Sequence, residues 1–153
     1  MAISARLHPR EDDSLLEHNL RTKTEYTISD QPSRTVFALM GNKIMSSNFK
    51  LCAERRLLNE WIRDARKHNI AEHQIIQWIL RKTGGKIYVW RIVSDGSFSC
   101  AVPCVFCKKE LLVFGVKVIC PLKSGGWFAG DLREPDAPTS KLTNGQRIRF
   151  AQK

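Results

Sequence analysis

The sequence predicts an α/β domain in which helices pack on both sides of a mixed β-sheet. Along the 153 residues, the expected elements follow the order helix, hairpin, helix, helix, strand, helix, strand. The dipeptide Gly41-Asn42 separates two apolar runs, which is typical of a hairpin and implies an antiparallel pair of strands. The nearly all-apolar run 116–120 is typical of a central strand that is buried on both faces. No repeat or linker divides the chain, so we expect residues 1–153 to form one domain.

The first half of the chain contains three predicted helices and the hairpin. We expect a flexible tail over 1–8, a helix over 9–20, strands over 34–40 and 43–47, and helices over 51–68 and 71–82. Leu15, Leu16 and Leu20 form the expected apolar face of the first helix. Gly84 and Gly85 mark the end of the third helix.

The second half alternates strands with a single helix. We expect a strand over 86–93, a helix over 103–114 that begins at a proline, strands over 116–120 and 125–129, and a loop with a basic tail over 133–153. Within this last stretch, residues 147–150 fit either a terminal strand or part of the tail.

Charge is distributed unevenly along the chain, which has a formal net charge of +10. Residues 1–30 carry four basic and six acidic side chains, whereas residues 31–153 carry 21 basic and nine acidic ones. A basic body favours a polyanionic partner such as DNA or RNA, although a basic protein without such a partner fits as well. No apolar run approaches the roughly 20 residues that span a bilayer, so no membrane partner is expected. The oligomeric state, including a homo-oligomer, is left open.

Two short motifs indicate a metal site. They are Cys52-Ala53-Glu54 and Pro103-Cys104-Val105-Phe106-Cys107, and each opens a predicted helix. Three cysteine thiolates would leave the fourth tetrahedral position of Zn²⁺ for water, which is the pattern of catalytic zinc. The five cysteines are an odd number and no export signal precedes them, so metal binding is favoured over disulfides. An intracellular location, in the cytoplasm or the nucleus, is therefore expected. Cys100 and Cys120 lie outside the pattern. Cys120 is predicted to be a small core residue, and Cys100 a core or surface residue, with a spare ligand as the alternative.

The two motifs together resemble the zinc-dependent cytidine deaminase-like superfamily in its three-cysteine form. The resemblance implies a three-layer α/β/α fold with a mixed central sheet of about five strands. It implies one Zn²⁺ per chain, held by three ligands at helix N-termini: Cys52, Cys104 and Cys107. It also implies that Glu54 shuttles protons and that Arg55 hydrogen-bonds the thiolates. The alternative for Glu54 is an acid that favours a helix dipole, and the alternative for Arg55 is a surface cation.

The sequence does not decide between the substrates of this superfamily. The free-nucleoside enzymes carry Asn-x-Glu before the catalytic helix, but here Ile44 stands two residues after Asn42. Lys43 beside it suits a phosphate, and Asn42, Lys43 and Asn48 are candidate substrate contacts or simple turn and cap residues. The polynucleotide deaminases carry the motif Ser-Trp-Ser-Pro-Cys at their second cysteine ligand. Here the residues before Cys104 are Cys100-Ala101-Val102-Pro103, so this motif is missing.

Aromatic side chains next to cations are typical of proteins that bind single strands. Trp127 and Phe128, flanked by glycines, are the best candidates for exposed stacking residues. We therefore expect a hydrolytic deaminase that converts cytosine to uracil in single-stranded DNA or RNA. A deaminase of free cytidine, of a nucleotide or of a modified nucleoside is the alternative. The second alternative is a catalytically silent, zinc-stabilised module that binds nucleic acid.

Overall fold

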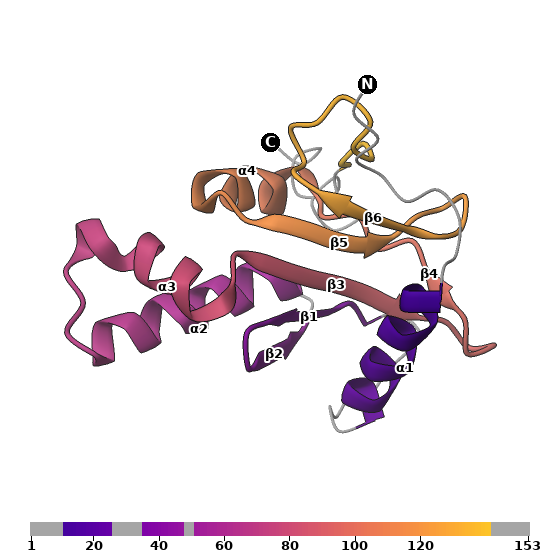
Figure 1. The fold of residues 1–153 in the computed structure, drawn as a ribbon, viewed down its shortest axis with the longest axis horizontal. Coiled ribbons are helices and arrows are strands. Elements are labelled where there is room, and N and C mark those ends of the chain that lie inside the picture. Colours follow the sequence, from indigo (N-terminus) through magenta and orange to yellow (C-terminus); the bar gives the residue numbers. More distant parts are fainter. Residues whose placement is uncertain (1–10, 26–34, 48–50, 142–153) are drawn as a thin grey trace, which may run out of the picture.

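The computed structural model describes residues 11–25, 35–47 and 51–141, and it contains a sheet with helices on both sides (Figure 1). In chain order the elements are α1 (Glu11–Glu25), β1 (Phe37–Met40), β2 (Lys43–Ser46), α2 (Ala53–Lys67), the short 3₁₀ helix η2 (Glu72–Gln74), α3 (Ile75–Thr83), β3 (Lys86–Ile92), β4 (Phe98–Ser99), α4 (Val105–Phe114), β5 (Lys117–Pro121) and β6 (Trp127–Gly130). The predicted tail over 1–8 and the stretch 147–150 lie outside the described residues.

The sheet is mixed, as predicted. Its strand order is β2-β1-β3-β5-β6, and the short β4 pairs with β3 beside this path. β3 and β5 are parallel, whereas the pairs β1–β2, β1–β3, β3–β4 and β5–β6 are antiparallel. A parallel pair needs a long crossover, and here the crossover from β3 to β5 carries α4. The order of elements along the chain therefore decides where α4 must lie.

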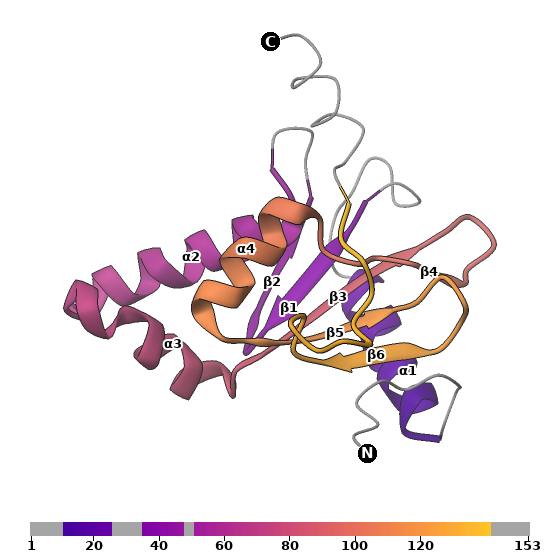
Figure 2. The ribbon, with the colours of Figure 1, turned by 90° about the horizontal axis from the view of Figure 1, so that it is seen from above.

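Alternating side chains on each strand build two apolar layers. On β3, Ile87 and Val89 pack in the layer under α2, α3 and α4, whereas Trp90 packs with Leu20 of α1 on the other face. Figure 2 shows α2, α3 and α4 gathered on one side of the strands and α1 on the other side. These layers confirm the expected α/β architecture with helices on both faces of a mixed sheet.

Helix α1 is longer than its sequence predicts. It continues five residues beyond the expected end at residue 20, to Glu25. The indole nitrogen of Trp90 donates a hydrogen bond to the hydroxyl of Thr24 at 2.8 Å, so a contact with β3 supports the last turn. The expected apolar face is correct for Leu20, which is buried, but wrong for Leu15, which is 62% exposed.

The expectation that Trp127 and Phe128 are exposed is wrong. Both lie on β6 and are buried, with 2% and 0% of their surfaces exposed. The ring of Trp127 packs against Phe98, and its indole nitrogen donates to the carboxylate of Glu17 at 2.9 Å. Phe128 points into the opposite layer, because consecutive residues of a strand face opposite sides. The flanking glycines shape the turn and leave these aromatic rings in the core.

The hairpin between β1 and β2 is held against α2 by close packing at its turn. Gly41 has a φ of +62°, and a Cβ atom at this position would lie 2.9 Å from the ring of Trp61. The indole nitrogen of Trp61 also donates a hydrogen bond to the carbonyl oxygen of Met40 at 3.0 Å. The turn therefore requires glycine for its backbone and for its contact with α2.

We expect Gly41→Ala to destabilise the fold by about 2–3 kcal/mol, since left-handed strain adds to overpacking against Trp61. The matched control is Gly115→Ala, at a φ of +73° with no atom within 4 Å of the new Cβ, where we expect about 1 kcal/mol. Urea unfolding of both variants measures the difference. Equal losses of unfolding free energy in the two variants would show that the Trp61 ring moves aside without destabilising the fold, which would contradict this prediction.

Candidate metal centre

Two helix N-termini meet at one point of the fold. Cys52 is the N-cap residue of α2, and Cys104 is the N-cap residue of α4. The sulfur of Cys104 accepts a hydrogen bond from the backbone nitrogen of Cys107 at 3.5 Å, which places both thiols on the first turn of α4. Figures 1 and 2 both show the two helices starting side by side and running in the same direction. The fold thus brings together cysteines that are more than 50 positions apart in the sequence.

The three sulfur atoms lie close enough to bind a metal ion. Those of Cys52 and Cys104 are 3.6 Å apart, and the three ligand atoms, including that of Cys107, all lie within 4.8 Å of one another. Tetrahedral zinc with Zn–S bonds of about 2.3 Å separates its sulfur ligands by about 3.8 Å. Thiolates are soft donors of the kind that Zn²⁺ takes. The residues present therefore fit such an ion, with three protein ligands and one position left for another molecule.

Without a cation, the site favours the neutral thiol at Cys52 and at Cys107. The hydrogen bond with Cys104 raises the pKa of Cys52 to about 12, and burial adds to this effect. Hydrogen bonds with Cys104 and Cys52, together with burial, raise the pKa of Cys107 far above its ordinary value. A metal ion binds the thiolate form, so its uptake must displace protons. Metal affinity at this site should consequently fall as the solution becomes more acidic.

Glu54 is a buried carboxyl beside these thiols. It lies in the first turn of α2 and only 3% of its surface is exposed. Burial raises the pKa of Glu54 to about 7, the charge at Cys104 adds to the rise, and a hydrogen bond with Cys107 opposes it. A carboxyl that gains and loses a proton near neutrality suits general acid–base chemistry. The structure thus brings Glu54 to the three cysteines, as the motifs predict.

The role predicted for Arg55 stays a prediction. Arg55 is half-buried on α2, and no hydrogen bond joins its guanidinium to the three thiols among the residues described. The next residue, Arg56, donates to the backbone carbonyl of Ser46 and so fastens β2 to the start of α2. That contact was missed by the sequence analysis, because nothing in the sequence distinguishes it from its neighbour.

The candidate substrate contacts of the hairpin do not lie at the metal centre. The ammonium of Lys43 is 3.7 Å from the carboxylate of Asp64 and 5.0 Å from the ring centroid of Trp61. Asp64 follows Cys52 by 12 residues, which is about 18 Å along a helix. Asn42 is exposed in the adjoining turn, and Asn48 lies outside the described residues. The hairpin therefore carries Asn42 and Lys43 toward the far half of α2.

Cys120 belongs to the core, as predicted, and it lies near Glu54. It is fully buried on β5 and packs in the layer under α2 and α4. Burial raises its pKa to about 12, and the nearby charges of Cys100 and Glu54 contribute. Alternation along the strand, which places Val118 and Cys120 on one face, is the signal that could have located it. Cys100 is half-buried and lies outside the ligand set, as expected.

The amino-acid sequence matches no protein-family model and no curated protein. The interpretation of the site therefore rests on the geometry of its own residues. In the part of the chain that the structure describes, no helix is both long and apolar enough to cross a membrane.

We expect the chain to bind one Zn²⁺ and expect Cys52→Ser, Cys104→Ser and Cys107→Ser each to weaken binding by at least about 100-fold. Cys100→Ser is the matched control and should bind zinc as the wild type does. Competition with a chromophoric chelator measures the affinities, and metal analysis measures the stoichiometry. Unchanged affinity in any of the three ligand variants would contradict this assignment.

The metal-free protein should show a pH-dependent stability that depends on Glu54. Its pKa rises on folding from 4.5 to about 7, so the neutral carboxyl is favoured. The stabilisation that comes from the neutral Glu54 carboxyl is complete at pH values below its pKa in the unfolded state. It is lost as the pH rises through its pKa in the folded state. At about pH 8, we expect Glu54→Gln to stabilise the chelator-treated protein by on the order of 3 kcal/mol, with little change at about pH 4. Urea unfolding at both pH values tests this, and a constant difference between them would count against it.

Proposed function

We propose that this protein is a zinc-dependent hydrolytic deaminase that converts cytosine to uracil, with single-stranded DNA or RNA as its substrate. The observation that carries the proposal is the carboxyl of Glu54, buried against three sulfur atoms that are spaced for a metal ion. A site that served only to hold the fold together would have no use for a buried carboxyl, since burying an ionisable group is costly. The geometry therefore favours catalysis over a silent, zinc-stabilised module.

Each site residue has a role in the proposed reaction. Cys52, Cys104 and Cys107 would hold Zn²⁺, which supplies a nucleophile by lowering the pKa of a water molecule. Water adds to the ring carbon that carries the amino group, and ammonia leaves, so cytosine becomes uracil. Glu54 accepts one proton from the water and delivers it to the ring nitrogen, and it then passes the second proton, from the hydroxyl on the ring carbon, to the departing amine. A carboxyl buried beside the metal ligands is placed to serve both proton transfers.

A free nucleoside or nucleotide, or a modified nucleoside, is the second candidate substrate. The burial of Trp127 and Phe128 favours it, because these rings do not offer a surface on which bases could stack. The net charge of +10 favours a polynucleotide, because neutral nucleosides gain nothing from a basic surface. The two substrate classes are separated by a direct assay.

We expect the zinc-loaded protein to deaminate cytosine and expect Glu54→Gln to reduce the rate by about 10²–10⁴-fold, since the proton shuttle is lost. Ammonia release and uracil formation are measured with cytidine, deoxycytidine, their monophosphates, and single-stranded DNA and RNA. The zinc content of the variant serves as the control and should match that of the wild type.

Conversion restricted to the polynucleotides supports the first substrate class, and conversion restricted to small molecules supports the second. A zinc-loaded wild-type protein that releases no ammonia from any of these substrates would overturn the enzyme assignment. It would leave the zinc-stabilised module as the interpretation of the site.

A further inference from the structure

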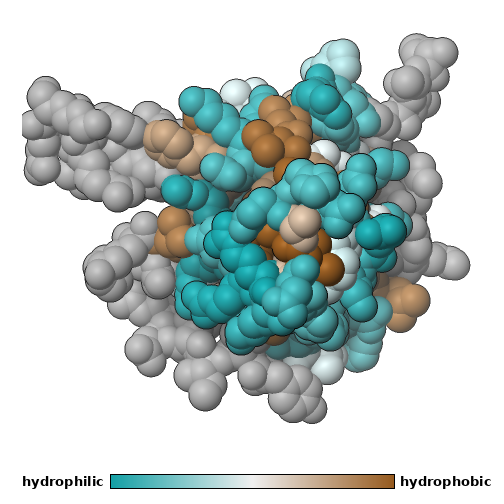
Figure 3. Space-filling model, turned by 90° about the vertical axis from the view of Figure 1, so that its left-hand side faces the viewer, coloured by the Kyte–Doolittle hydropathy of each residue, from teal (hydrophilic) through white to brown (hydrophobic). Residues whose placement is uncertain are grey.

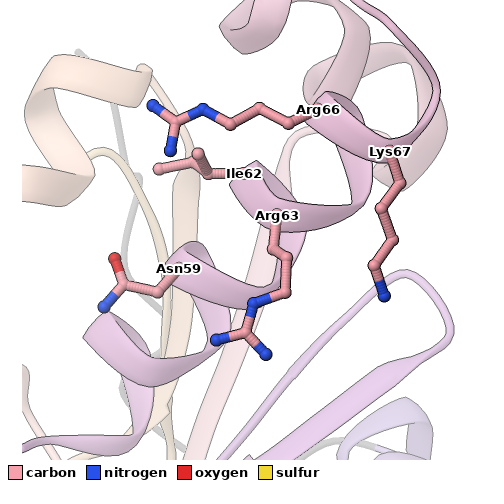
Figure 4. A pocket seen from close by; sticks show the side chains of 5 residues that line it. All are labelled: Asn59, Ile62, Arg63, Arg66 and Lys67. Carbon is pink, nitrogen blue, oxygen red and sulfur yellow. The ribbon is translucent and has the colours of Figure 1, made fainter.

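The outer face of α2 carries a basic hollow away from the metal ligands. Its volume is about 720 Å³, and it is open to solvent because all of its lining side chains come from two turns of one helix. They are Asn59, Ile62, Arg63, Arg66 and Lys67. Figure 4 shows Ile62 between the guanidinium groups of Arg66 and Arg63. Figure 3, which views the molecule from the left-hand side of Figure 1, shows hydrophilic side chains around a small apolar centre.

The charges of this hollow are available to an anion. The side chains of Arg63 and Arg66 are 65% and 61% exposed, respectively. Arg63 pairs with Glu60 at 2.9 Å and Arg66 with Glu72 at 2.9 Å, and both pairs lie at the surface. Exposed pairs of this kind contribute little, and each guanidinium has five donor hydrogens, so a phosphate can bind beside or in place of the carboxylate.

A continuous row of side chains connects the hollow to the metal centre. Cys52, Arg55, Asn59, Arg63 and Arg66 follow each other at intervals of three or four residues, so they lie along one face of the helix. From Cys52, the hollow begins about 10 Å along the helix axis at Asn59 and ends about 22 Å along it at Lys67. One helix therefore fixes the distance between the metal centre and the cations.

We propose that this face of α2 binds the sugar–phosphate backbone of a single-stranded nucleic acid while its target base occupies the metal centre. The second half of this inference rests on the proposed deaminase function. Arg63, Arg66 and Lys67 follow Cys52 by 11 to 15 residues. At about 1.5 Å per residue these cations lie about 17–22 Å along the helix from the metal centre, which is beyond the reach of a single nucleoside bound there. Arginine binds phosphate through two parallel hydrogen bonds, and Ile62 and Asn59 offer contacts to sugar and base. The substrate that uses the whole row is a polynucleotide.

The test compares the binding of fluorescein-labelled oligothymidylate and oligouridylate by the full-length, zinc-loaded protein. These probes contain no cytosine, so binding is measured without a reaction. Neutralising the hollow with Arg63→Gln, Arg66→Gln and Lys67→Gln together should raise the Kd at least about tenfold near 0.1 M salt. The same variant should reduce the steepness of the plot of log association constant against log salt concentration by about 2. For single strands, each phosphate contact contributes about 0.7 to this slope, and three contacts are removed.

The matched control neutralises three exposed lysines outside α2, with Lys86→Gln, Lys117→Gln and Lys123→Gln together. This variant carries the same net charge as the first one, and we expect its Kd to stay within about twofold of the wild type. Because the probes contain no cytosine, their binding is measured independently of ammonia release, which separates this inference from the deaminase assignment. Equal losses in the two triple variants, no binding by the wild type, or equally effective competition by polyglutamate would each overturn the proposal.

Discussion

The candidate site depends on the meeting of two helix N-termini, which brings together three thiols and a buried carboxyl. Cys52 caps α2 and Cys104 caps α4, and their sulfur atoms come to within 3.6 Å. In the absence of a cation the site favours the neutral forms of Cys52 and Glu54, whose pKa values are raised. A divalent ion reverses that preference, because thiolates then become ligands and the partial positive charges of both helix ends assist them. Metal binding and the packing of α2 against α4 are therefore expected to stabilise each other.

Helix α2 has three different surfaces. Its apolar side, with Leu57, Trp61 and Ala65, is buried in the main core against the sheet. Its first turn carries Glu54 to the metal centre, and its outer side carries the cations of the hollow. The tight turn at Gly41 and the hydrogen bond from Trp61 to Met40 fix the helix on the hairpin. A rigid helix held in this way gives the site and the basic face a constant separation, which a flexible loop would not.

Sequence periodicity predicted most elements, but it was less informative about which side chains are exposed. The hairpin turn at Gly41 and the helices that begin near Cys52 and Cys104 were correctly expected, since these features depend on neighbouring residues. The length of α1 was underestimated, because its last turn is supported by Trp90 from β3. The burial of Trp127 was missed for the same kind of reason: its partners, Glu17 and Phe98, are distant in the sequence.

The sequence by itself determined the donors of the site: three cysteines and a glutamate at helix starts, in a spacing that suits a metal ion. It did so because cap residues and i, i+3 spacing are local properties of the chain. Only the tertiary structure decided that these donors converge and that Cys120 packs in the core near Glu54. It also decided that Lys43 pairs with Asp64, about 18 Å along α2 from Cys52. Such outcomes depend on strand order and on the face that each side chain takes, and these are settled only when the sheet assembles.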